Sequence, residues 1–336
     1  MTDLKVAVVG LGGIGALHAG ITASLPGCQL VAAVDREARL VKIASKAIST
    51  VRFYTEVPEM LAREAPDIVY LCTPPTTHLP LSRSILQHPN RPRALFVEKP
   101  LAMNTGEAAE MVALAQQAGT ITGVGFQRRF LPTVQKAKEF IDAGEIGEVR
   151  LARAHHFVAA IFEPGEGWKF SPEAGGVTLE MGVHLLDTMV SLFGEPTVLG
   201  RETARMFSAA CEDYASAWLR FGPGTLASFE VGWSMWGFEP ADFRIEVYGS
   251  RGGLTVTQDA LTVFARPSGG SLTARTIPSS QLVGRLPILL GGVENVLIDM
   301  DFTSAVAAGR SPLVTFETGL RVNRVLDAIR ATAPKG

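Results

Sequence analysis

Apolar and polar positions along the first 125 residues predict strands that alternate with helices. Short apolar runs, rich in β-branched residues, occupy residues 4–9, 29–34, 67–72, 93–97 and 121–124. Segments with helical spacing lie between them, at 14–25, 37–47, 58–64, 79–87 and 105–118. Because these strands are apolar throughout rather than at every second position, they are typical of a parallel sheet buried on both faces. The order of elements predicts βαβ units.

The pattern changes after about residue 125, where longer strands with alternating polarity begin. One helix is predicted at 132–143, a strong helix at 176–193, and two more at 292–308 and 316–332. Between them the strands are predicted at 147–157, 197–205, 213–221, 225–233, 243–249 and 253–265. Glycine-rich turns join several of these strands, which favours a large, mainly antiparallel open sheet with helices on one face.

The first strand ends in a glycine-rich turn that is typical of a nucleotide site. Gly10, Gly12, Gly13, Ile14 and Gly15 belong to a GxGxxG pattern that follows a predicted strand and opens a predicted helix. In this pattern the glycines permit a tight turn, close approach of the backbone to a pyrophosphate, and close packing of helix on strand. The helix N-terminus adds N–H donors and a partial positive charge. We therefore predict a Rossmann domain over residues 1–124, followed by an α+β domain over 125–336 whose C-terminal helices can return to the first domain.

The end of the second strand indicates the cofactor. Asp35 lies twenty positions after Gly15, where a carboxylate can accept hydrogen bonds from the adenosine ribose. Arg36 follows it and could pair with a 2′-phosphate. We predict NAD, with NADP tolerated.

Two further strand ends fall at the edge where a Rossmann sheet binds its ligand. Thr73, Pro74 and His78 follow one strand, and Glu98 and Lys99 follow the next. A charged pair directly after a buried strand is unfavourable unless it is paired or used. We include all five in the predicted cofactor site, with a local ion pair as the alternative for Glu98 and Lys99.

Composition limits the other possibilities. Hydrophobic residues make up 47% of the 336 residues, charged residues 19%, and the net charge is −2. No basic surface that would favour nucleic acid or an anionic membrane is expected. The three cysteines, far apart, are expected to be thiols in a reducing compartment. With no signal peptide, no apolar run of membrane-spanning length and no metal-binding motif, we predict a cytoplasmic protein without a metal.

Six segments together resemble the glucose–fructose oxidoreductase / inositol dehydrogenase family (Gfo/Idh/MocA), and the resemblance covers almost the whole chain. They are GLGGIG at 10–15, CTPPTTH at 72–78, EKPLA at 98–102, GFQRRF at 125–130, AGEIGEV at 143–149 and GWKFSPEAGGVTLEMGVHLLD at 167–187. The resemblance implies hydride transfer between NAD(P) and a hydroxyl or ketone of a sugar, inositol or related polyol. It also implies a homodimer or homotetramer assembled through the open sheet face.

The resemblance assigns roles to particular residues. Lys99, the lysine of the EKP segment, is expected beside the nicotinamide and the reacting oxygen, and His184 is expected to be the acid/base partner. Where the family normally has aspartate and tryptophan-arginine, this sequence has Glu180 and Trp168-Lys169. The exact substrate and the reaction direction are left open.

The residues themselves support this chemistry. Glu180, His184 and Asp187 stand at i, i+4 and i+7 and would share one stripe of a regular helix. A histidine suits the role of base near neutral pH. Lys99 would hold the developing oxygen charge, and Glu180 would orient His184 or bind a substrate hydroxyl. The alternative is a core histidine held by Glu180.

Three further residues are predicted to bind substrate. Arg129 could hold hydroxyls or a carboxylate, or could form a surface ion pair. His155 and His156 point to opposite faces of one strand, and we favour His155 for the cleft. Trp168 could stack on a sugar or belong to the core.

Two other functions use the same features. One is a non-catalytic NAD-bound sugar sensor, in which Lys99 and His184 would have no task. The other is glycoside cleavage by way of transient oxidation, with no net change in NADH.

Overall fold

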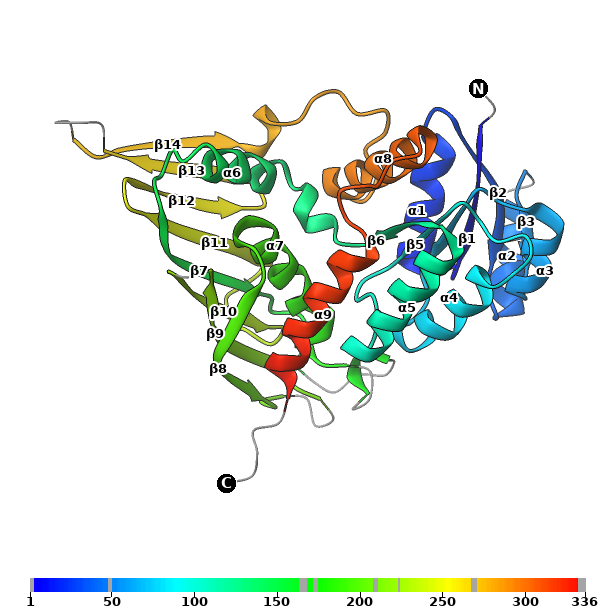
Figure 1. Ribbon diagram of the computed structural model, residues 1–336, viewed down its shortest axis with the longest axis horizontal. Helices are drawn as coiled ribbons and strands as arrows, with labels where there is room; N and C mark the ends of the chain where they lie inside the picture. The colour runs from blue at the N-terminus through cyan, green and yellow to red at the C-terminus, as the bar shows by residue number, and fades with distance from the viewer. Residues whose placement is uncertain are drawn as a thin grey trace. The chain divides into compact units, whose positions relative to one another are not determined.

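The computed structural model describes residues 3–47, 50–162, 168–171, 175–207, 211–222, 224–266 and 271–331. They form two compact units. The first contains residues 1–126 and 286–323, and the second contains 127–285 and 324–336. Figure 1 shows the first unit around the blue and cyan elements and the second around the green and yellow sheet.

The first unit is built on a parallel six-stranded sheet with the order β3-β2-β1-β4-β5-β6. Strands β4 (Ile68–Leu71) and β5 (Ala94–Val97) are buried at every position, as the continuous apolar runs predict. The other strands are β1 (Leu4–Val9), β2 (Cys28–Val34), β3 (Arg52–Tyr54) and β6 (Ile121–Val124). The three-residue β3 was not predicted, because it is too short to show a period.

Helices connect these strands. They are α1 (Gly13–Ser24), α2 (Ala38–Ala47), α3 (Val57–Glu64), α4 (His78–Leu86) and α5 (Thr105–Ala118). Helix α8 (Val293–Ala308), although close to the C-terminus, packs beside α1 (Figure 1). The start of α9 (Phe316–Arg330) also belongs to this unit. The C-terminal part of the chain thus contributes two helical segments to the Rossmann unit.

The second unit contains an eight-stranded sheet with the order β14-β13-β12-β11-β7-β10-β9-β8, in which all neighbouring pairs except β7 and β10 are antiparallel. Its strands are β7 (Val149–Phe157), β8 (Pro196–Ala204), β9 (Tyr214–Phe221), β10 (Thr225–Gly232), β11 (Asp242–Gly249), β12 (Gly252–Thr257), β13 (Ala260–Ala265) and β14 (Thr273–Pro278). The predicted fold class, a Rossmann domain followed by an α+β domain with a large open sheet, is confirmed.

Two details of the second unit differ from the prediction. The single strand expected at 253–265 is two strands, because the chain turns at Gln258 and Asp259 and Thr257 Oγ1 accepts the Ala260 N–H at 3.1 Å. Strand β14 was not predicted, because its side chains are mostly exposed and show no alternation. It is an edge strand, paired only with β13.

Helices α6 (Pro132–Asp142) and α7 (Val183–Phe193) pack on one face of this sheet. The predicted helix over 176–193 does not run as a regular α-helix. Residues Thr178–Gly182 form a π-helical turn that leads into α7. Gly182 lets this turn approach the sheet, since a Cβ there would lie 3.1 Å from the Phe229 ring. No helix among the described residues has the length and apolar character needed to cross a membrane.

Candidate active site

The glycine turn of the first unit contains two kinds of glycine. At two positions the fold leaves no room for a side chain, and at two others the backbone borders open space. Gly10 has a φ of +95°, and a Cβ there would lie 2.6 Å from the Cys72 carbonyl oxygen. A Cβ at Gly15 would overlap with the Gly10 carbonyl. Cβ atoms at Gly12 and Gly13 would meet nothing within 4 Å. The turn therefore leaves its backbone open at the two positions where a dinucleotide pyrophosphate approaches.

The start of α1 fits an anionic group. Gly12 is the N-cap and supplies no side-chain acceptor, and the first turn holds no acidic residue. Ile14 lies in this turn and is half-buried. The N–H groups of the first helical turn and the helix dipole thus favour a phosphate here. The residues present fit the cofactor that the sequence predicts.

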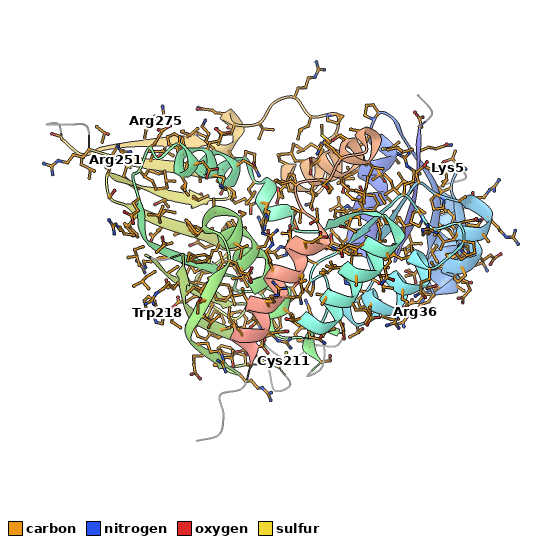
Figure 2. All side chains as sticks on the ribbon, viewed as in Figure 1. Lys5, Arg36, Cys211, Trp218, Arg251 and Arg275 are labelled. Carbon is orange, nitrogen blue, oxygen red and sulfur yellow. The ribbon has the colours of Figure 1, made fainter. Side chains whose placement is uncertain are left out.

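Asp35 lies directly after β2 and is tied to the glycine turn. One carboxylate oxygen, Oδ2, accepts the Leu11 N–H at 2.8 Å, and Oδ1 accepts the Glu37 N–H at 2.9 Å. The side chain is half-buried, whereas Arg36 beside it is exposed (Figure 2). The carboxylate is therefore held at the strand end by two backbone donors.

The turn after β5 carries Lys99 and is held by a buried acid. Glu98 is 6% exposed, and its Oε2 accepts the Lys99 N–H at 3.0 Å. Its Oε1 lies 3.0 Å from His18 Nε2. Both oxygens of Glu98 therefore have partners within the protein. Lys99 itself is half-buried.

His78 joins the turn after β4 to the turn after β5. Its Nδ1 lies 3.0 Å from the Pro100 carbonyl oxygen and 3.1 Å from that of Leu101, and its Nε2 lies 2.9 Å from that of Thr73. Burial lowers the pKa of this imidazole, although the backbone carbonyls oppose the shift. Because His78 is fully buried, it has no exposed atom with which to bind a cofactor. The prediction of direct contact is corrected to a role in joining the two turns.

The remaining strand-end residues surround this joint. The Thr77 hydroxyl donates to Thr73 Oγ1 at 2.7 Å, and Pro74 is exposed. On the other side, the Asn323 side chain of α9 donates to the Ala102 carbonyl at 2.9 Å. The EKP segment is thus anchored from several elements of its own unit.

In the second unit, the π-helical turn changes the predicted stripe. Glu180 lies in that turn and is half-buried, while His184 and Asp187 lie in α7 and are buried. A π-helix has more residues per turn than an α-helix, so the regular i, i+4 alignment expected from Glu180 to His184 does not apply. The expected α-helical spacing holds only from His184 to Asp187. Single π-turns are frequent at functional sites.

Arg129 forms a buried ion pair rather than a surface one. Its Nε lies 2.9 and 2.8 Å from the two carboxylate oxygens of Asp187, and the two side chains are 11% and 0% exposed. Burial raises the pKa of Asp187 to about 6, although the charge and hydrogen bond of Arg129 oppose the shift. The pair ties the segment at the start of the unit to α7. No local pattern predicted this pair, because Arg129 and Asp187 are 58 positions apart.

His155 does not share a face with α7. It pairs across the sheet with Glu230 and Arg244, and its Nε2 lies 2.9 Å from Asp242 Oδ2. The adjacent His156 is buried on the face that α7 covers, where it packs against Phe243. The alternation along β7 was predicted correctly, and the helices cover the face of His156. That His155 binds substrate stays a prediction.

The side chain of Trp168 lies outside the described part of the structure. Lys99 belongs to the first unit and His184 to the second, and their meeting stays a prediction. Among the described residues, no group of three His, Cys, Asp or Glu side chains is arranged to hold a metal ion. The three cysteines are free thiols.

Sequence reasoning missed His18 and Asp299. His18 is 1% exposed and lies on α1, where its Nδ1 is 2.9 Å from both carboxylate oxygens of Asp299 on α8. The one signal in the sequence was a histidine in an otherwise apolar and small helix. Its acidic partner is 281 positions away, so no local pattern could identify it.

Two family models match this chain. Residues 4–126 match an oxidoreductase family described as an NAD-binding Rossmann fold, and residues 134–255 match the GFO/IDH/MocA C-terminal domain. The chain belongs to the Gfo/Idh/MocA family. The resemblance drawn from the six segments is therefore confirmed, and the protein is an NAD-binding oxidoreductase of a family that acts on inositols and sugars.

Individual members of the Gfo/Idh/MocA family resemble the chain over most of its length. It is 26% identical to scyllo-inositol 2-dehydrogenase (NAD(+)) of Bacillus subtilis, over 98% of each chain. It is 28% identical to myo-inositol 2-dehydrogenase of Thermotoga maritima, over 74% of each. Among solved structures, levoglucosan dehydrogenase in complex with NADH has a TM-score of 0.88 at 20% identity, over 98% of this chain and 96% of that one. The last likeness concerns the fold alone.

Proposed function

We propose that this protein is an NAD-dependent dehydrogenase that oxidises a secondary hydroxyl of an inositol, sugar or related polyol. The observation that carries the proposal is the edge of the six-stranded sheet. There the open Gly12–Gly13 turn, the Asp35 carboxylate and the Lys99 turn follow the carboxyl ends of β1, β2 and β5, three strands of the same parallel sheet. In a Rossmann sheet this edge binds the dinucleotide. The inositol dehydrogenases named above support the substrate class.

The proposed chemistry needs two proton-handling groups. The nicotinamide, when bound, supplies the hydride acceptor. As the C–H bond breaks, the substrate hydroxyl loses its proton, and we assign that proton to His184. Lys99 donates a hydrogen bond to the same oxygen and stabilises the negative charge that develops there. Glu180 orients His184 or holds a neighbouring hydroxyl. Reduction of a ketone uses the same groups in reverse.

Asp35 favours NAD over NADP in this proposal. Its carboxylate, fixed by two backbone N–H groups, would repel a 2′-phosphate. Fluorescence titration with NADH and NADPH tests the preference. We expect NADH to bind at least about tenfold more tightly, or about 1.4 kcal/mol, and Asp35→Asn to narrow that ratio. Glu37→Gln, an exposed neighbour, is the matched control.

A panel of inositols, sugars and linear polyols tests the function. Each is incubated with the protein and NAD, and the absorbance of reduced nicotinamide is followed. A substrate-dependent increase supports the proposal. Tight binding of a sugar with no increase, and with no product, would instead favour a sensor. Release of a leaving group from a glycoside without net NADH would favour cleavage by transient oxidation.

We further propose that two or more copies associate through the open face of the second unit's sheet. Leu226 and Tyr248 pair with Leu151 from the two neighbouring strands, and their side chains are 40% and 44% exposed. Trp218 lies on the same face of the sheet and is 58% exposed (Figure 2). Light scattering tests the proposal. We expect Trp218→Glu to lower the mass of the assembly, whereas Trp236→Glu, exposed outside the strands, leaves it unchanged.

A further inference from the structure

The first unit contains a buried chain of charges that ends at Lys99. Asp299 on α8 contacts His18 on α1, His18 contacts Glu98 after β5, and Glu98 accepts the Lys99 N–H. Asp299 is 0%, His18 1% and Glu98 6% exposed. Charges buried to this extent are unfavourable unless they compensate one another. Three elements, distant in sequence, thus converge on the backbone of the predicted catalytic lysine.

The geometry defines the charge of His18. Each ring nitrogen faces a carboxylate, Nδ1 at 2.9 Å from Asp299 and Nε2 at 3.0 Å from Glu98. A neutral imidazole has one N–H and one lone pair, so one carboxylate would face a lone pair. The doubly protonated ring satisfies both. Burial lowers the pKa of His18, but the two carboxylates outweigh it and raise the pKa to about 10.

The other groups around His18 do not supply charge. The rings of Tyr70 and Phe96 lie with centroids 5.2 Å from the imidazole. Burial raises the pKa values of Tyr70, Cys72 and Cys28, so these groups are neutral near pH 7. The His18 imidazolium is therefore the cation that the two carboxylates share, and the aromatic rings and thiols around it are uncharged.

The space for Glu98 is also built into the backbone. A Cβ at Gly125, directly after β6, would collide with the Glu98 carboxyl group, because it would lie 2.7 Å from the carboxyl carbon. Glycine there leaves room for an oriented carboxylate. The position of Glu98 is thus set by a charge on one side and by the absence of a side chain on the other.

We propose that His18 and Asp299 are positioning residues for Lys99, acting through Glu98. Asp299 fixes the imidazolium, the imidazolium fixes one oxygen of Glu98, and the other oxygen fixes the backbone from which the Lys99 side chain extends. This inference rests on the proposed function, in which Lys99 holds the reacting oxygen. Displacing a reacting group by about 1 Å can lower a rate by about 100-fold.

Asp299→Asn tests the chain by removing one of the two carboxylates while His18 and Glu98 stay in place. The amide keeps the shape of the carboxylate, and its oxygen can still accept from His18 Nδ1. With the polyol that the panel identifies, we expect kcat to fall at least about tenfold while KM for NAD changes less than about threefold. We also expect the kcat–pH profile to change. Asp301→Asn is the matched control, because Asp301 is on the same helix and pairs with Arg310 at the surface, with Nη2 and Oδ1 3.3 Å apart.

A double variant separates positioning from general loss of structure. If Asp299 acts through Lys99, then Asp299→Asn combined with Lys99→Ala is no slower than Lys99→Ala alone, because the target of the positioning is already gone. A merely structural role would multiply the two losses. Multiplied losses, or a kcat for Asp299→Asn equal to that of the Asp301→Asn control, overturn the inference.

The same experiments distinguish this inference from the proposed function. If the protein oxidises a polyol and Lys99→Ala lowers kcat about 1,000-fold while Asp299→Asn does not lower it, the positioning chain alone is rejected. If no polyol is oxidised, the proposed function is rejected and the inference with it. If a polyol is oxidised but Lys99→Ala retains turnover near that of the wild type, the dehydrogenase function stands and both the role of Lys99 and the positioning inference are rejected.

Discussion

The two units hold their predicted catalytic side chains beside buried charges, but in different ways. In the first, one imidazolium lies between two carboxylates, and the network ends at the backbone of Lys99. In the second, a single pair joins Arg129 to Asp187, one turn after His184 on the same helix.

The difference determines how each cluster titrates. Two carboxylates outweigh burial and raise the pKa of His18 to about 10. One guanidinium does not outweigh burial, and the pKa of Asp187 rises to about 6. We therefore expect His18 in the first unit to stay charged through the neutral pH range. In the second unit we expect Asp187 to titrate near pH 6. The number of opposite charges, rather than the depth of burial, makes the difference.

Substitution of Lys99 has the largest expected effect. We expect Lys99→Ala to lower kcat about 1,000-fold or more, because the developing oxygen charge loses its donor, while NAD affinity stays within about tenfold, because phosphate contacts elsewhere supply most of the binding. Stopped-flow kinetics measure the loss in turnover, and equilibrium titration measures the affinity for NAD. Lys138→Ala, in an exposed pair with Asp142, is the control. Turnover near that of the wild type would remove Lys99 from the mechanism.

Substitution of His184 tests the contribution of the second unit. We expect His184→Asn to lower kcat about 100-fold or more, because the proton of the hydroxyl loses its acceptor. His155→Asn, on the opposite face of the sheet, should keep kcat within about threefold of the wild-type value. Steady-state kinetics on the same substrate compare them. Equal losses in both variants would contradict the assignment of faces.

The ion pair between Arg129 and Asp187 is expected to contribute to the stability of the second unit. We expect Arg129→Gln to lower the free energy of unfolding by about 3 kcal/mol at pH 8, because it leaves a buried carboxylate unpaired. All four tryptophans lie in the second unit, so fluorescence during urea unfolding reports on it.

The sign of the pH effect follows from the raised pKa. Protonation of Asp187 contributes stability that is full below about pH 3.8 and is lost as the pH rises through about 6. The loss in Arg129→Gln should therefore be smaller at pH 5 than at pH 8, and Arg129→Gln with Asp187→Asn should recover most of it. An equal loss at both pH values would contradict this titration.

The smallest effect is expected for the pH dependence of the first unit. The raised pKa of His18 contributes stability that is full below about pH 6.5 and is lost as the pH rises through about 10. We expect protection of the β1 and β5 amides from hydrogen exchange to weaken from pH 7 to pH 10 by on the order of 2 kcal/mol. His18→Gln should be less protected at pH 7 and show a flatter dependence. Parallel dependences in the two proteins would show that His18 is not the titrating group.

Much of the first unit could be predicted because its signals are local. The buried runs of β4 and β5 show their strands directly, and the glycine turn from Gly10 to Gly15 has one plausible use between a strand and a helix. His78 shows the limit of this reasoning. Its position at a strand end indicated a ligand contact, but the carbonyls of Thr73, Pro100 and Leu101 engage both its nitrogens.

In the second unit, the alternation of polar and apolar residues predicted the strands, but it did not show which face of the sheet the helices cover. The sequence separated His155 from His156, and only the packing of α7 showed which of them is buried. The π-helical turn at Thr178–Gly182 was also beyond prediction, because its apolar pattern equals that of a regular helix.

The sequence alone determined the family and most of the helices and strands, and it supplied the prediction of which residues carry hydride-transfer chemistry, because each of these depends on neighbours along the chain. The tertiary structure decided which charges are compensated, since His18 meets Asp299 across 281 positions and Arg129 meets Asp187 across 58. Burial and Coulomb attraction depend on distance in space, and no period or motif encodes that distance.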